Sequence, residues 1–307
     1  MSGLQTKDKR TRDMSRVRIS LRKGAAMVHN DTISESGMAL DDRKQEEVDF
    51  HNQRELDRQA LDAASFERRY SNKQWYSVTR RSEDYVANWL RDNCPGKVAL
   101  DYCCGLGGIS LRLAEAGAFV HAIDISDESV NTSKEKLQEA GFGDSCQMQV
   151  MDAEKLTFPD NTFDVIICSG VLHHLDLEHA YPQLSRVLKP TGKILCIEAV
   201  GHNPIFRLYR KLTPHLRTSW EVDHILKVKD LRTAKTFFDG IDVQFFHLFG
   251  VGAAFLRKTP FFGAALSVLD SLDAVVLKMP GIRMMAWQMV FELSKPKLGS
   301  SEQREAA

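Results

Sequence analysis

Residues 98–124, VALDYCCGLGGISLRLAEAGAFVHAID, decide the fold. The apolar run at 98–100 predicts a buried strand, and the glycines within 105–108 allow backbone to approach a ligand closely. Residues 109–116 have the apolar spacing of a helix, and a second apolar strand then ends at Asp124, where nucleotide-binding folds place a ribose-binding acid. This order of strand, glycine turn, helix and strand is half of a nucleotide-binding α/β fold.

Asp101, at the end of the first strand, favours one cofactor over another. Its carboxylate would repel a pyrophosphate bound on the following turn, but it would attract a ligand with an amine or sulfonium charge. S-adenosylmethionine has both of these cations together with adenine and ribose. It therefore fits the sequence better than NAD, and GLGGIS also lacks the last glycine of the dinucleotide pattern.

The segment LDYCCGLGG resembles the first motif of the class I S-adenosylmethionine-dependent methyltransferases, an acid followed by Gly-x-Gly-x-Gly. Asp101, Gly105 and Gly107 match this motif, whereas Cys103 stands where the family usually has its first glycine. The resemblance implies that these four residues lie at the cofactor.

Further motifs follow in the family's order over residues 66–200. Asp124 ends VHAID as the family's second acid does, which implies hydrogen bonds to both ribose hydroxyls. Asp152 follows a third apolar strand and resembles the acid that accepts a hydrogen bond from the adenine amino group. The resemblance also implies cofactor contacts at Ile125, Ala153 and Ser169.

Apolar runs place the remaining strands at residues 147–151, 164–169, 193–199, 242–249 and 287–293. Helices alternate with these runs, which predicts a parallel sheet covered by helices on both faces. By the resemblance, the last two runs supply a parallel sixth strand and an antiparallel seventh inserted beside it. We expect a Rossmann-like α/β fold with a seven-stranded, mostly parallel sheet.

The flanking regions differ from this core, taken as residues 97–296. Residues 1–45 are crowded with lysine and arginine and poor in aromatics, which predicts a flexible basic tail. Residues 46–96 read as a helical extension, and 297–307 as a second flexible tail. In the resembling family such an extension commonly covers cofactor and acceptor, which implies four candidates for the pocket wall: Tyr70, Lys73, Trp75 and Tyr76.

Two connections are longer than this fold needs. Residues 201–230, rich in arginine, histidine and aromatics, leave the fifth strand at the edge where open α/β sheets bind ligands. Residues 250–285 contain an amphipathic helix, and we expect both insertions to cover the acceptor site. For the second insertion three interpretations stand: an apolar lid for a bulky acceptor, a cover over the core, or shallow membrane contact by residues 255–280.

Histidine is the candidate base. Methyl transfer from a sulfonium depends mainly on alignment, but an oxygen or nitrogen acceptor can still require proton removal, for which histidine has a suitable pKa. The candidates are His173 and His174 after the fourth strand, His202 after the fifth, and His224 in the first insertion. We interpret His173 as lining the site rather than as the base, and the pair Glu221 and His224 as surface charge rather than a metal site.

The composition argues against several classes of protein. With 41 basic and 41 acidic residues in 307, the chain has no overall charge to attract nucleic acid. The sequence CSGVLHHL lacks the Asp/Asn-Pro-Pro-aromatic motif of enzymes that methylate base amino groups. The six cysteines lack metal-ligand spacing, so we expect no metal and reduced thiols in a cytoplasmic protein. No apolar run predicts a membrane-spanning helix.

These observations lead to one preferred function and two alternatives. We expect a methyltransferase that uses S-adenosylmethionine to methylate an oxygen, in preference to nitrogen or carbon, of a hydrophobic small molecule. It resembles enzymes of quinone, polyketide and other secondary-metabolite pathways. The alternatives are a methyltransferase-like scaffold protein without catalysis, and a protein or RNA methyltransferase recruited by the basic tail.

Overall fold

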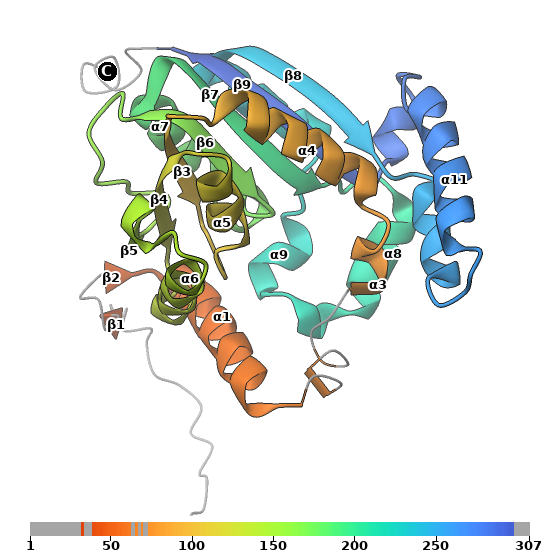
Figure 1. The fold of residues 1–307 in the computed structure, drawn as a ribbon, viewed down its shortest axis with the longest axis horizontal. Helices are drawn as coiled ribbons and strands as arrows, with labels where there is room; N and C mark the ends of the chain where they lie inside the picture. The colour runs from red at the N-terminus through yellow and green to blue at the C-terminus, as the bar shows by residue number, and fades with distance from the viewer. Residues whose placement is uncertain (1–31, 34–38, 63–64, 67–68, 70–72, 298–307) are drawn as a thin grey trace, which may run out of the picture.

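The computed structural model describes residues 32–33, 39–62, 65–66, 69 and 73–297 (Figure 1). Most of the predicted basic tail, the predicted pocket residue Tyr70 and nearly all of the C-terminal tail lie outside these residues. The helical extension begins at Asp42, four residues earlier than expected, because the Asp41 side chain caps the helix by accepting a hydrogen bond from the Lys44 amide.

The predicted seven-stranded sheet is confirmed. Its strands are β3 (Val98–Tyr102), β4 (Phe119–Asp124), β5 (Cys146–Val150), β6 (Phe163–Ser169), β7 (Leu188–Ala199), β8 (Phe238–Phe246) and β9 (Gln288–Pro296). They lie in the order β5-β4-β3-β6-β7-β9-β8. All pairs are parallel except those of β9, which is antiparallel to both β7 and β8, as expected for a last strand inserted beside the sixth. Outside this sheet, β1 (Thr32–Ile33) pairs with β2 (Ala39–Leu40).

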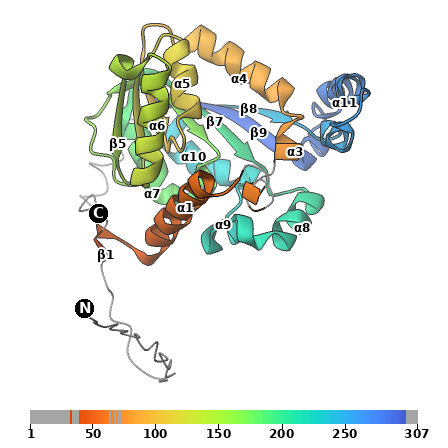
Figure 2. The same cartoon turned by 60° about the horizontal axis from the view of Figure 1, so that its bottom comes forward.

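Helices cover both faces of the sheet (Figure 2). The described helices are α1 (Asp42–Ala60), α3 (Lys73–Tyr76), α4 (Arg80–Asn93), α5 (Gly108–Glu115), α6 (Asp127–Glu139), α7 (Leu177–Val187), α8 (Pro204–Leu212), α9 (Ser219–Asp223), α10 (Leu231–Phe237) and α11 (Phe262–Val276). The 3-10 turns are η1 (Gly143–Ser145), η2 (Leu172–His174), η3 (Pro214–Leu216), η4 (Val228–Asp230), η5 (Gly250–Leu256) and η6 (Ile282–Met285). None of these helices is long and apolar enough to cross a membrane.

Two hydrophobic cores fill the layers. On one face, Trp89 of α4 and Leu113 of α5 pack in a cluster with strand residues such as Val120. On the other face, Tyr181 of α7 and Phe237 of α10 pack in the largest cluster. Because β3 and β6 are covered on both faces, their side chains are nearly all buried, as parallel strands require.

The second insertion lies away from the first half of the sheet. Helix α11 packs on η5 and stands beside α3 at the far side of the molecule (Figure 1), where Arg80 pairs with Asp270 at 2.9 Å. Strand β8 is the edge strand of the sheet. The loop that follows β8 therefore starts at this lateral edge, several strands away from β3. Phe261, Val268 and Val275 are each more than 60% exposed, so one side of this helix faces outward.

The turn after β3 brings backbone against α6. Gly107 has a φ of 68°, and a Cβ atom there would lie 2.2 Å from the Ser133 hydroxyl oxygen. Gly105 has a φ of 49°, but a Cβ atom there would meet no atom of the described residues within 4 Å. Gly107 is therefore required by packing, whereas Gly105 borders open space.

Replacing each glycine by alanine separates backbone strain from packing. Both Gly105→Ala and Gly107→Ala place a side chain at positive φ, at a cost of about 1–2 kcal/mol. Gly107→Ala also forces a clash, which adds about 1–3 kcal/mol. Chemical denaturation should therefore show a larger loss of unfolding free energy for Gly107→Ala, and equal losses would contradict this packing account.

Candidate active site

A pocket lies where the first strands of the sheet end, beneath α1. Its walls come from the segments that follow β3, β4, β5 and β6, and from side chains of α1 and η2. The wall includes seven of the residues predicted to contact a cofactor: Cys103, Gly105, Asp124, Ile125, Asp152, Ala153 and Ser169. The cavity measures about 210 Å³, below the range of about 300–1,000 Å³ usual for ligand pockets, because α1 lies directly over it.

Asp124 joins the glycine turn to the second strand. Its Oδ2 accepts a hydrogen bond from the Gly105 amide at 2.9 Å, and its Oδ1 accepts one from the Ser126 amide at 3.0 Å. A carboxylate has about four lone-pair positions, so each oxygen can still accept from a ligand hydroxyl. The side chain lines the pocket, and this arrangement fits a diol such as ribose.

Cys103 has the backbone conformation of a glycine. Its φ is 64°, in the left-handed region that costs other residues about 1–2 kcal/mol. This explains why the resembling family has glycine here. Burial raises the pKa of the Cys103 thiol well above its ordinary value, so the side chain stays neutral and is no nucleophile.

Asp101 lies beneath the glycine turn rather than on the pocket wall. It is 1% exposed, and its Oδ2 accepts a hydrogen bond from the Ser110 hydroxyl at 2.6 Å. Burial raises the pKa of Asp101 to about 7. The structure therefore differs from the expectation of a charged carboxylate that meets the ligand cation directly.

Paired charges fasten α1 over the pocket. Lys44 Nζ lies 2.7 Å from Asp152 Oδ2 and 2.9 Å from Glu154 Oε2. Arg43 donates to both Glu154 oxygens, at 2.7 and 2.9 Å. Burial lowers the pKa of Lys44, but its hydrogen bonds with the two acids outweigh that effect and raise the pKa above its ordinary value. Lys44 thus binds one oxygen of Asp152, the residue that by the resemblance accepts a hydrogen bond from adenine.

His173 is held on both ring nitrogens. Nδ1 lies 2.8 Å from Glu198 Oε2, and Nε2 lies 3.1 Å from Glu221 Oε1. Burial alone lowers its pKa, but the charges and hydrogen bonds of the two glutamates raise it to about 9. Glu198 also accepts hydrogen bonds from the backbone amides of Val171 and Leu172, each at 2.8 Å. Together these contacts fix the segment that follows β6.

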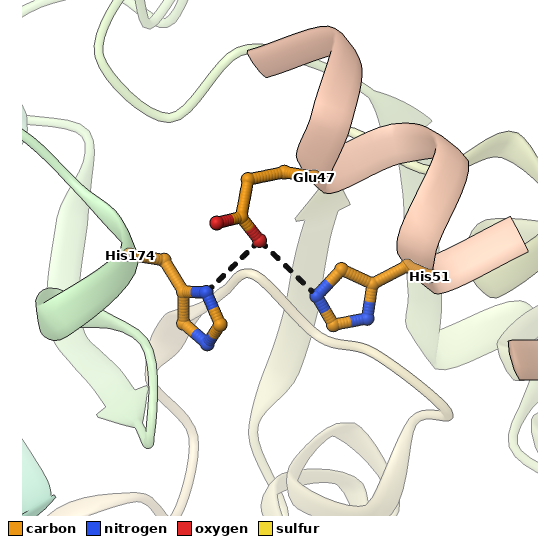
Figure 3. Close-up of side chains that lie close together, drawn as sticks. All are labelled: Glu47, His51 and His174. Atoms are coloured by element: carbon orange, nitrogen blue, oxygen red, sulfur yellow. Dashed lines mark hydrogen bonds and ion pairs between the residues drawn. The ribbon is translucent and has the colours of Figure 1, made fainter. Parts of the chain in front are cut away.

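His174 lines the pocket and meets α1 (Figure 3). Its Nδ1 lies 3.0 Å from Glu47 Oε2, and its Nε2 lies 3.4 Å from Glu221 Oε1. Glu47 Oε2 also lies 3.6 Å from His51 Nε2, and Glu47 Oε1 accepts a hydrogen bond from the Thr218 hydroxyl at 2.6 Å. Burial raises the pKa of Glu47, but its hydrogen bonds with the two histidines outweigh this and hold the pKa well below its ordinary value.

Comparison with known proteins identifies the fold around this pocket. A family profile described as a methyltransferase domain matches residues 100–196, which run from β3 to β7 and carry most of the pocket wall. Residues 100–196 therefore form a methyltransferase domain. This agrees with the S-adenosylmethionine-dependent family that the motifs resemble.

Curated relatives of the chain are named as methyltransferases. The chain is 33% identical to demethylmenaquinone methyltransferase from Bacillus cytotoxicus over 48% of this chain and 61% of that protein. It is 38% identical to the ubiquinone/menaquinone biosynthesis C-methyltransferase of Teredinibacter turnerae over 34% of this chain and 43% of that protein. The chain thus spans less than two thirds of the length of either relative.

A solved structure has the same fold as the methyltransferase domain. Geranyl diphosphate methyltransferase aligns with a TM-score of 0.51 at 16% identity, over 70% of this chain and 86% of that chain. At that identity the likeness concerns the arrangement of strands and helices alone.

Several predicted site residues do not line the described pocket. His202 accepts a hydrogen bond from the Val228 amide at 3.0 Å, and His224 is exposed and stacks on Trp220 at 3.5 Å. Of the four candidate histidines, only His174 is on the described pocket wall. Gly107 packs on α6, as described above. The predicted pocket residue Trp75 instead contacts Tyr209 and Phe255.

The sequence did not predict several charged or titratable residues around the pocket, among them Arg43, Lys44, Glu47, His51, Glu154 and Glu198. Glu198 left a signal, because it is the only charged residue in the otherwise apolar stretch ILCIEA. The four residues of α1 left none, because alternating charges on a helix are typical of a solvated surface. They reach the pocket only because α1 packs on the sheet edge.

Cys103 allows a test of the backbone conformation. We expect Cys103→Gly to keep the unfolding free energy within about 1 kcal/mol of wild type, since relief of strain offsets the lost side chain. Cys103→Val adds a β-branched side chain at positive φ and should lose about 2 kcal/mol or more. Denaturant titrations that show the reverse order would contradict this conformation.

Asp101 sets a pH dependence of stability. Its pKa rises from the ordinary 3.8 to about 7 in the folded chain, so the native state binds a proton that the unfolded chain has released. The stability of wild type relative to Asp101→Asn should therefore fall as pH rises from about 4 to about 7, and then stay constant. Urea unfolding of both proteins between pH 4 and 8 measures this difference, and a constant difference would contradict it.

Proposed function

We propose that the chain is an S-adenosylmethionine-dependent methyltransferase whose acceptor is a hydrophobic small molecule with a hydroxyl group. The main support for this proposal is the position of Asp124 on the pocket wall. Its carboxylate is held by two backbone amides on the pocket wall and keeps lone pairs for a diol. When bound, S-adenosylmethionine supplies a methyl group on a sulfonium whose thioether departs as a neutral group.

The chain's residues fit this cofactor at several points. Asp124 would bind the ribose hydroxyls, and Gly105 leaves open space because no atom of the described residues lies within 4 Å of where its Cβ would be. Asp152 would bind the adenine amino group. Because the cavity of about 210 Å³ lies directly beneath α1, cofactor binding requires the first turn of α1 to shift, which enlarges the pocket.

The atom that is methylated is an oxygen or a carbon. One relative is named as a C-methyltransferase of ubiquinone and menaquinone biosynthesis, and this name favours a carbon more than the sequence alone did. A ring carbon becomes a good nucleophile when a neighbouring hydroxyl loses its proton. Both reactions therefore need a general base that takes a proton from an acceptor hydroxyl. His174, hydrogen-bonded to Glu47 on the pocket wall, lies where it can act as this base.

Exposed apolar side chains support a hydrophobic acceptor. Ile205, Leu208 and Leu212 on α8 are 58–73% exposed, and Phe255 after β8 is 80% exposed. Such exposed apolar surfaces suit contact with a hydrophobic acceptor or with a membrane in which the acceptor is dissolved. Peripheral membrane contact thus remains part of this proposal.

Calorimetry with S-adenosylmethionine tests the cofactor assignment. Asp124→Ala removes charge-assisted hydrogen bonds worth about 1.5–3 kcal/mol, so its affinity should fall by about 10- to 150-fold. The matched control is Asp239→Ala on β8, where the side chain is 66% exposed and far along the sheet. Equal affinity of wild type and Asp124→Ala would contradict the assignment.

Labelled methyl donor tests the acceptor class. In a lysate of the native host, label should enter a product that organic solvent extracts. Label in protein or RNA would instead support the macromolecular alternative, and binding without any transfer would support the scaffold alternative.

A further inference from the structure

We propose that Glu47, His51 and His174 bind a divalent transition-metal ion on the wall of the pocket. Glu47 and His51 are four residues apart and so lie one turn apart on α1, and His174 comes from η2 after β6 (Figure 3). All three side chains line the cavity. The site is therefore formed only when α1 lies against the sheet.

The distances between the ligand atoms suit one ion. Glu47 Oε2 lies 3.0 Å from His174 Nδ1 and 3.6 Å from His51 Nε2, and all three atoms lie within 4.8 Å of one another. With metal–ligand bonds of about 2.1 Å, the ligand atoms of a tetrahedral site are about 3.4 Å apart. A small rotation of the half-exposed His51 ring would complete the site.

The type of ligand matches metals that catalyse reactions. Two imidazoles and one carboxylate suit zinc, cobalt, iron or manganese, and three protein ligands leave a coordination position for substrate or water. Because the three side chains line the cavity, that open position faces the pocket.

Neighbouring groups orient two of the ligands. Glu221 Oε1 lies 3.4 Å from His174 Nε2, on the side of the ring away from Glu47, and Thr218 donates to the other oxygen of Glu47 at 2.6 Å. Metal-binding histidines usually have such a carboxylate on the second nitrogen, where it sets the tautomer and the ring orientation.

The contacts among Glu47, His51, His174 and Glu221 require a positive charge between the carboxylates and the imidazoles. Glu47 Oε2 faces two imidazole nitrogens, while both nitrogens of His174 face carboxylate oxygens. Neutral imidazoles cannot donate to all of these acceptors, because each has a single N–H. Either extra protons or one metal ion must lie there, and the metal ion satisfies all three groups at once.

His173 does not belong to this site. His173, His174 and Glu221 also have ligand atoms close together. Both nitrogens of His173 are already bound to Glu198 and Glu221, at 2.8 and 3.1 Å. His173 therefore positions the loop and leaves His174 free to face α1.

The role of the metal rests on the proposed function. An ion at this place would bind the hydroxyl oxygen of the acceptor, lower the pKa of that hydroxyl and orient the acceptor in the pocket. His174 and Glu47 would then act as ligands in place of a base, and the hydroxyl proton would leave to solvent. The acceptor would then need an oxygen that can bind a metal, such as that of a phenol or an enol. The ion would also join α1 to the sheet after the acceptor has entered.

Cobalt binding to the full chain tests the site. After removal of metals with EDTA, Co²⁺ should bind with one saturable equivalent and give the visible absorption of a nitrogen- and oxygen-ligated ion. The variants Glu47→Gln, His51→Gln and His174→Gln should each weaken binding by more than the roughly 10- to 100-fold that changes around metal ligands cost. The control is His179→Gln on α7, whose ring is 68% exposed and should not affect Co²⁺ affinity.

His51→Gln is the decisive variant, because its side chain is 32% exposed and its loss should not unfold the chain. Unchanged Co²⁺ affinity in this variant, or no saturable site in wild type, would overturn the proposal. Calorimetry with S-adenosylmethionine in EDTA separates the two claims: cofactor binding without cobalt binding refutes the metal site alone, and cobalt binding without cofactor binding refutes the proposed function alone.

Discussion

The buried charges that hold α1 over the sheet edge determine the rest of the site. The positively charged Lys44 and Arg43 of α1 form ion pairs with Asp152 and Glu154, which follow β5. Charges taken out of water are stable only when they are paired, so removing one partner of such a pair typically costs about 3–5 kcal/mol. The closeness of Glu47 and His51 to His174 follows from this docking.

A second buried carboxylate shapes the opposite wall. Glu198 ends an apolar strand and binds two backbone amides and His173. It thereby fixes the segment after β6 in one conformation and aims His174 at the pocket. The two walls therefore depend on acids that the sheet presents at its carboxyl edge, and Asp124, the acid proposed to bind the cofactor, lies at the same edge.

The sequence predicted features that arise from neighbouring residues. Strand periodicity and the glycine turn are local, so the strands and the position of Asp124 at the end of the second strand could be predicted from the residues themselves, and the antiparallel last strand from the family resemblance. Contacts between distant segments could not: Lys44 and Asp152 are 108 positions apart, and Glu47 and His174 are 127 apart. His224 was predicted near the site because it lies in the first insertion. That insertion does contact the site, through Glu221 and His173, but the His224 side chain is exposed.

The most direct test of the account is a crystal structure of the chain with S-adenosylhomocysteine. We expect the ribose hydroxyls within hydrogen-bonding distance of the Asp124 carboxylate, the adenine beside Asp152, and the first turn of α1 displaced from its present position over the pocket. A nucleoside bound elsewhere on the chain, or bound in this pocket without contact to Asp124, would contradict it.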